Sequence, residues 1–170
     1  MHIGIMIISD SSTLILLTKC GLIESFLSDF SLIIPKTVYN EAIRKGVEMG
    51  KYDAYLLEKL VHGGKIQVMQ SNKESLKEVQ DFFSLHCGES DAISLCKDIK
   101  AECLLCDDKK AINACKVLGL KFATALNILS AMHATGRISD EEANESLNRL
   151  EEFGWYNLEL IKKIRSEING

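Results

Sequence analysis

The chain has 170 residues, 46% of them hydrophobic and 26% charged, with a formal net charge of −4. Its length suits one domain with a single hydrophobic core, and its mild acidity excludes broad, sequence-independent binding of phosphates through net charge. Nucleic acid would have to be bound through a local basic rim or through metal ions. Neither a signal peptide nor a membrane-spanning apolar stretch is evident, so we expect a cytoplasmic protein with no membrane partner.

Strand-like and helical patterns alternate along the chain, which favours βαβ units around a parallel sheet with helices on both faces. The predicted strands cover about 3–9, 31–34, 65–69, 102–106 and 120–123. The predicted helices cover about 11–18, 21–28, 36–45, 51–62, 72–84, 89–99, 109–118 and 125–135, followed by one that begins with a capping signal at 138–142 and one from 157 onward.

The six cysteines have two interpretations. In a reducing compartment they are expected to be free thiols in the core. Cys103 and Cys106 have the spacing of half a zinc site, but residues three apart on a strand point to opposite faces, and no second ligand pair completes the set.

Carboxylates follow two of the predicted strands, which right-handed connections would make neighbours. Asp10 ends the first strand, and Asp107 and Asp108 end the strand 102–106. In an open parallel sheet the binding crevice lies beyond the carboxyl ends of the strands, so these side chains are expected at that crevice. Glu41 and the motif at 88–93 place further carboxylates, Glu89 and Asp91, at the borders of apolar helix faces.

Carboxylates that converge on one crevice repel one another, and their pKa values would rise unless a cation joined them. A set with oxygen ligands favours Mg²⁺ or Mn²⁺, which would support attack of water on a phosphodiester. Ser11 and Thr13 would then orient bound water or a phosphate oxygen. The alternatives are ordinary: Asp10 and one of Asp107 and Asp108 would cap helices, and the remaining carboxylates would be solvated or would favour a helix N-terminus.

Four short motifs with acidic residues follow one another along the chain: residues 7–12 (IISDSS), 34–41 (IPKTVYNE), 88–93 (GESDAI) and 104–111 (LLCDDKKA). Residues 118–120 (LGL) and 124–129 (TALNIL) follow. This arrangement resembles the PIN-domain ribonucleases, in particular the VapC-like prokaryotic PIN proteins. The resemblance implies a three-layer α/β/α sandwich with a central parallel sheet. It covers about residues 5–136, within a nuclease domain expected over 1–136, and residues 137–170 are expected to form a helical extension packed on the same domain.

The resemblance also implies a metal-dependent endoribonuclease with Mg²⁺ or Mn²⁺ as cofactor. The residues that match the acidic tetrad are Asp10, Glu41, Asp91 and Asp108. Asp107 competes with Asp108, and Glu89 competes with Asp91, as metal ligands. Many VapC-like proteins are toxins of type II toxin–antitoxin systems and form homodimers, so an antitoxin and a second copy are expected partners beside the RNA substrate. The alternatives are a housekeeping RNA-processing nuclease and a non-cleaving scaffold that binds RNA or protein.

Two surfaces bear on partners. Basic residues around the predicted site would contact the RNA backbone or simply be solvated: Arg44, Lys45, Lys109 and Lys110. The first helices, 14–17 and 22–27, carry more apolar residues than one stripe needs, which predicts either core packing or a dimer or antitoxin surface. Trp155 and Tyr156 would cover the sheet edge or add to an interface.

Overall fold

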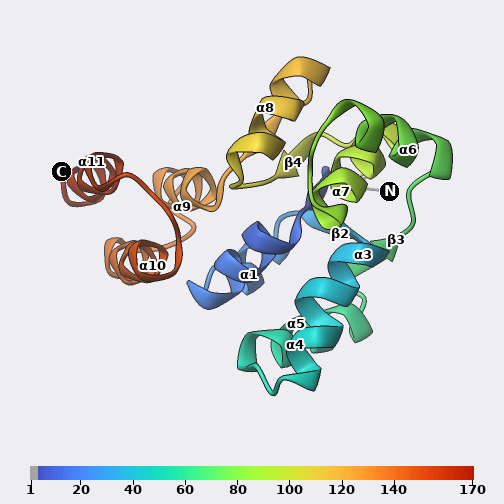
Figure 1. Cartoon of the computed structure of the whole chain (residues 1–170). Coiled ribbons are helices and arrows are strands. Elements are labelled where there is room, and N and C mark those ends of the chain that lie inside the picture. The colour runs from blue at the N-terminus through green and yellow to red at the C-terminus, as the bar shows by residue number, and fades with distance from the viewer. Residues whose placement is uncertain (1–3) are drawn as a thin grey trace.

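The sheet is built as the sequence predicts. The computed structural model describes residues 4–170, so the predicted start of the first strand, at residue 3, lies outside the described residues. Within this range the strands are β1 Met6–Ser9, β2 Ser31–Pro35, β3 Ile66–Met69, β4 Cys103–Leu105 and β5 Phe122–Ala123. All pairings are parallel, in the order β3-β2-β1-β4-β5, so β1 and β4, which both end at carboxylates, are central neighbours (Figure 1).

The helices also lie close to the predicted ranges. Before the third motif they are α1 Ser11–Lys19, α2 Ile23–Leu27, α3 Lys36–Val38, η1 Tyr39–Arg44, α4 Lys45–Glu48, α5 Tyr52–His62 and α6 Lys73–Phe82. After it come α7 Cys87–Asp98, α8 Lys109–Leu118, α9 Ala125–Ala134, α10 Asp140–Phe153 and α11 Leu158–Asn169. The single helix predicted over 36–45 is an α-helix interrupted by the π-helical turn η1, a feature that often marks a functional position.

Alternating side chains of the strands fill two cores, one on each face of the sheet. Ile7 and Leu105 face the core beneath α1, α2, α9, α10 and α11. Ile8 and Leu104, one position away, face the core beneath α7 and α8. This two-residue period is the pattern of strands buried on both faces, and it confirms the predicted three-layer α/β/α sandwich.

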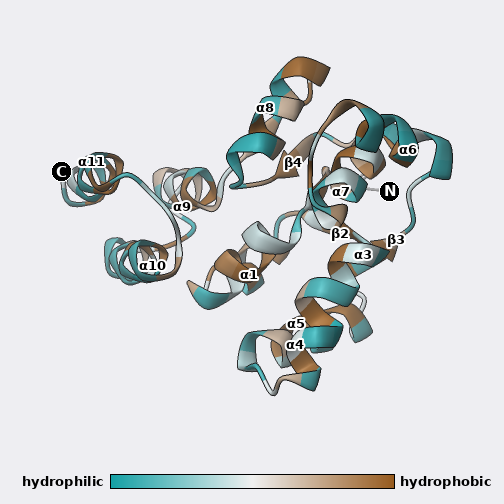
Figure 2. Cartoon of the chain, in the orientation of Figure 1, coloured by the Kyte–Doolittle hydropathy of each residue, from teal (hydrophilic) through white to brown (hydrophobic). Residues whose placement is uncertain are grey.

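The last two helices pack onto the first core. Leu147 and Leu150 of α10 and Ile161 of α11 are buried in the same cluster as the apolar residues of α1. Figure 1 shows α10 and α11 side by side beyond α9, and in Figure 2 the visible side of α10 is mainly hydrophilic. The helical extension therefore contributes to the core, whereas its boundary at residue 137 stays a prediction.

The apolar surplus of the first helices belongs to the core. Leu14 and Leu17 of α1, and Leu22 and Phe26 beside them, are at most 1% exposed. These side chains are covered by the chain's own helices, so they do not form the partner surface that was the alternative prediction. Of the cysteines, those at positions 20, 96, 106 and 115 are buried, as predicted for core thiols, whereas Cys103 is half-buried and Cys87 is exposed, so for Cys87 the prediction was wrong. None of the helices within residues 4–170 has the length and apolar character needed to cross a bilayer.

Candidate functional site

Asp10 is held at the carboxyl end of the sheet by backbone groups of β4 and α1. Its amide N–H donates to Leu105 O at 3.0 Å, which joins the end of β1 to β4. Its Oδ1 caps α1 by accepting a hydrogen bond from the Thr13 amide at 2.9 Å. The side chain is 1% exposed, and within the described residues its Oδ2 has no hydrogen-bond partner. Asp10 therefore caps a helix and still presents one free, buried oxygen.

This environment makes the ionised form of Asp10 costly. Burial raises the pKa of Asp10 to about 7, although the hydrogen bonds from Thr13 lower it, and the charges of Asp107 and Glu89 raise it further. A buried carboxylate with a raised pKa and an unpartnered oxygen is a common feature of functional sites. A cation beside Oδ2 would favour the charged form and lower this pKa.

Asp10 opens onto a cavity of about 340 Å³, here called the carboxylate cavity. Its lining residues are Asp10, Ser11, Ser12, Glu41, Lys45, His86 and Glu89. Glu41 lies on η1, and its Oε2 accepts a hydrogen bond from the Ser11 hydroxyl at 2.6 Å. Ser11 thus orients a second carboxylate, and three predicted carboxylates, Asp10, Glu41 and Glu89, share one cavity.

Glu89 reaches the carboxylate cavity from the first turn of α7. Its Oε2 accepts a hydrogen bond from the His86 amide at 3.1 Å, which caps the helix and fixes the carboxylate. Burial raises the pKa of Glu89, the hydrogen bond from His86 lowers it, and the charges of Asp108 and Glu41 raise it. These carboxylates repel one another, and a bound cation would reduce that repulsion.

Asp91, the other candidate of the third motif, lies elsewhere. It is 3% exposed, and it accepts hydrogen bonds from the Thr37 hydroxyl at 2.6 Å and from the Ser71 hydroxyl. Both carboxylate oxygens are therefore engaged, and Asp91 does not line the carboxylate cavity. It joins α7 to α3 and to the segment before α6, a structural role that sequence reasoning did not foresee.

Asp107 and Asp108 divide two roles between them. Asp108 caps α8, with Oδ1 accepting from the Lys110 amide at 2.8 Å and the Ala111 amide at 3.1 Å. Asp107 accepts from the Thr13 hydroxyl at 2.7 Å, the Ala125 amide at 3.1 Å and the Tyr156 hydroxyl. Asp107 is thus occupied by three donors and joins β4, α1, α9 and the C-terminal segment.

The two hydroxyls predicted to support the site differ in use. Ser11 donates to Glu41, whereas Thr13 donates to Asp107 and so holds the structure behind the site. Tyr156 was missed as a partner of Asp107 because 49 residues separate the two. The one feature of the sequence that could have indicated this contact is the position of Tyr156 beside Trp155, in a linker that is otherwise polar.

The predicted basic rim is split between two hollows. Lys45 lines the carboxylate cavity, and Lys109 and Lys110 line a neighbouring cleft. Arg44 lines neither of them and forms an exposed ion pair with Glu48 at 3.5 Å.

A divalent cation suits this set of ligands. As the side chains stand, no three His, Cys, Asp or Glu groups within residues 4–170 are close enough together to hold one ion directly. Magnesium, however, usually takes only one or two protein carboxylates and fills its other positions with water and substrate phosphate. The free Oδ2 of Asp10, with Glu89 and Glu41 on the same cavity, meets that requirement.

Replacing Gly88 with alanine is expected to reduce activity without loss of stability. A Cβ at this position would clash with Glu41 Oε2 and lie 3.2 Å from Ser11 Oγ, so Glu41 would have to turn away. Displacement of a group that takes part in a reaction by about 1 Å costs on the order of 10²-fold in rate, while alanine in a helix is favoured over glycine by about 1 kcal/mol. Cleavage assays and thermal unfolding of Gly88→Ala measure the two effects.

The matched control for Gly88→Ala is its combination with Glu41→Gln. If the glycine acts through Glu41, the double variant should be no less active than Glu41→Gln alone. A further large loss in the double variant would show that Gly88 has another role.

Similarity to known proteins identifies the family of the chain. The family model of a PIN domain matches residues 6–169 of the chain. The chain therefore belongs to the PIN-domain family. The chain is also similar to Endoribonuclease Nob1 of Pyrococcus abyssi (strain GE5 / Orsay), with 36% identity over 77 residues. This similarity covers 41% of the chain and 47% of the relative, so the chain spans about half the length of the curated relative it matches.

Proposed function

We propose that the protein is a metal-dependent endoribonuclease that hydrolyses RNA phosphodiester bonds with Mg²⁺ or Mn²⁺. The observation that carries the proposal is the buried Asp10, whose free oxygen faces a cavity shared with Glu41 and Glu89. Membership of the PIN-domain family and similarity to a protein named as an endoribonuclease support it. A binding scaffold would have no need to bury a carboxylate with an unpartnered oxygen.

Five residues of the cavity, and Asp108 of the neighbouring hollow, have roles in this proposal. Asp10 would hold the cation, together with Glu89 and, through water, Asp108. When bound, the cation would lower the pKa of a water molecule and offset the charge that develops on the phosphate. Glu41, oriented by Ser11, would accept a hydrogen bond from the attacking water and take up its proton. Lys45 at the cavity edge would attract the phosphate.

Asp91 and Asp107 have supporting roles in this proposal. Both are saturated with hydrogen bonds from the chain itself, so they are better placed to hold elements together than to bind a cation. We therefore propose Glu89 in place of Asp91, and Asp108 in place of Asp107, as metal ligands.

Metal-dependent cutting of RNA tests the proposal. Purified protein should cleave a mixed RNA pool with Mg²⁺ or Mn²⁺, lose this activity in EDTA and regain it when the metal is restored. A closed circular RNA in the same assay should be cut as well, because an endonuclease needs no free end. Intact RNA in every metal condition, with a folded protein that binds Mn²⁺, would contradict the proposal.

The biological setting is a further part of the proposal. We propose a toxin of a type II pair that forms a homodimer and is held by an antitoxin, on the basis of the VapC-like motifs. A housekeeping RNA-processing nuclease would use the same cavity. A neighbouring gene that encodes a small DNA-binding protein would support the toxin setting, and its absence would favour RNA processing.

A further inference from the structure

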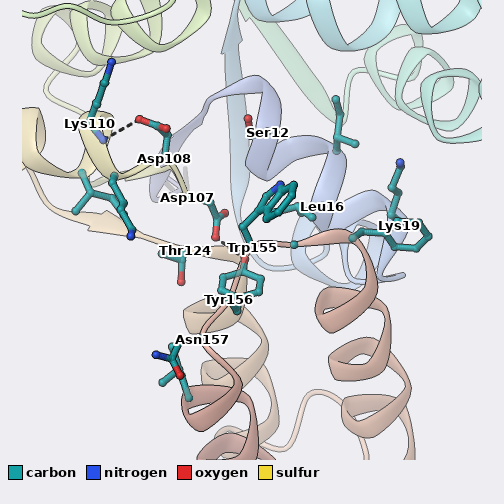
Figure 3. A pocket seen from close by; sticks show the side chains of 16 residues that line it. Ser12, Leu16, Lys19, Asp107, Asp108, Lys110, Thr124, Trp155, Tyr156 and Asn157 are labelled. Atoms are coloured by element: carbon teal, nitrogen blue, oxygen red, sulfur yellow. Dashed lines mark hydrogen bonds between the residues drawn. The ribbon is translucent and has the colours of Figure 1, made fainter.

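A second and larger hollow lies beside the carboxylate cavity. It has a volume of about 770 Å³ and is here called the Trp155 cleft; it lies between the N-terminal end of α8, the side of α1 and the linker that joins α10 to α11 (Figure 3). Ser12 lines both hollows, and Asp108 stands at the end of the cleft nearest α8. The two hollows therefore share Ser12 as a common lining residue.

Trp155 stands free in this cleft. Its exposed fraction is 102%, so no other side chain covers the indole, and Figure 3 shows the ring between Asp108 on one side and Lys19 on the other. A fully exposed tryptophan lacks the favourable burial that usually holds such a large apolar side chain in place. Such exposure in a hollow indicates a surface that gains its contacts on binding.

The linker beneath Trp155 is fixed, so the indole is presented from a firm base. The Tyr156 hydroxyl donates to Asp107, and because burial and the charge of Asp107 raise the pKa of Tyr156, this hydroxyl stays a donor. Gly154 lets the linker close tightly, because a Cβ there would clash with the Tyr156 ring and with Leu150 O. Anchoring on both sides reduces the entropy lost when Trp155 engages a ligand.

Three lysines, together with Asp107 and Asp108, line the cleft around the indole. Lys109 and Lys110 project from the start of α8, and across the cleft Lys19 lies with its Nζ 4.8 Å from the centre of the Phe153 ring. This local group of lysines contrasts with the net charge of −4 of the chain. An aromatic face between lysines is the arrangement that binds single-stranded nucleic acid, since bases stack on the ring and phosphates pair with the lysines.

We propose that the Trp155 cleft binds the single-stranded RNA segment next to the cleaved bond, with one base stacked on Trp155 and flanking phosphates on Lys19, Lys109 and Lys110. The inference rests on the proposed function and adds to it a subsite for the RNA outside the carboxylate cavity. Paired RNA is excluded from this mode, because a base inside a helix cannot offer its face to the indole.

The fluorescence of Trp155 reports on the cleft directly, because it is the only tryptophan of the chain. Titration with a short, mixed-sequence single-stranded RNA in EDTA, where no cleavage occurs, should quench this fluorescence to saturation. Fluorescence anisotropy of a labelled copy of the same RNA should show about tenfold or greater weakening in Trp155→Ala, as expected for loss of one base–aromatic stack. Trp155→Phe should retain most of the affinity.

Tyr52→Ala is the matched control, since Tyr52 on α5 is 84% exposed and does not line the cleft. It should bind the RNA as the original protein does. Equal affinity of Trp155→Ala and the original protein, or tighter binding of duplex than of single-stranded RNA, would overturn the inference even if cleavage were demonstrated. Conversely, quenching without cleavage in any metal would support the cleft and contradict the proposed function.

Discussion

Replacing Asp10 with asparagine should abolish RNA cleavage and leave the fold intact. Asparagine has nearly the same shape and can still accept the Thr13 hydrogen bond that caps α1. It cannot supply the anionic Oδ2, so the cation loses its buried ligand. Activity should fall by at least about 10³-fold, the loss typical when a group that acts only in the reaction is removed. Cleavage assays on the folded variant measure this effect.

The same substitution should stabilise the metal-free protein at neutral pH. The pKa of Asp10 is about 7 in the folded chain against 3.8 for the ordinary carboxyl. Below pH 3.8 Asp10 is protonated in both states, and between these values the unfolded state releases its proton first. The free energy of unfolding of the original protein therefore falls with rising pH across this window, by on the order of a few kcal/mol, and then stays low.

Thermal unfolding in EDTA at several pH values tests this sign. The melting temperature of Asp10→Asn should exceed that of the original protein by an amount that grows from pH 4 to pH 8. Mn²⁺ should raise the melting temperature of the original protein and have little effect on the variant. Asp81→Asn, a change at an exposed carboxylate of α6, serves as the control and should alter neither property. Full cleavage by Asp10→Asn would refute the site assignment.

The sequence was sufficient for the sheet and for the edge where the site lies. Strand ends are marked by a change from apolar residues to carboxylates, and parallel connectivity brings such ends together, so Asp10 and Asp108 could be placed without coordinates. The Tyr156–Asp107 contact could not be placed, because it joins two loops through a long-range packing of α10 and α11 that local periodicity does not encode.

The choice between Glu89 and Asp91 depended on the phase of a helix. Successive residues of an α-helix are about 100° apart, so positions 89 and 91 point in directions about 200° apart. The predicted helix began near residue 89, whereas α7 begins at Cys87, so both residues lie within regular turns and only one can face the cavity. A shift of two residues at a helix start, within the usual uncertainty of such boundaries, changes which of the two side chains is expected at the cavity.

Glu89→Gln should therefore lower the cleavage activity, whereas Asp91→Asn should lower the free energy of unfolding. Glutamine keeps the cap on His86, so Glu89→Gln should fold with nearly unchanged stability and lose about 10²-fold or more of its cleavage activity. Asp91→Asn places an amide NH₂ group against a hydroxyl that now donates, so it should lower the free energy of unfolding by about 1–3 kcal/mol. Urea unfolding measures the second effect, and cleavage at a temperature where both variants are folded measures the first.

The pair separates a metal ligand from a structural carboxylate because each variant is the control for the other. Asp91 accepts hydroxyl groups from two segments, and its loss should loosen the contact of α7 with α3 while molecules that remain folded still cut RNA. If Asp91→Asn were inactive and stable, and Glu89→Gln active, then Asp91 would have to leave both hydroxyl partners to reach the cation. The Thr37 and Ser71 hydroxyls would then lose their shared acceptor, and this cost is the reason that we propose Glu89, and not Asp91, as the metal ligand.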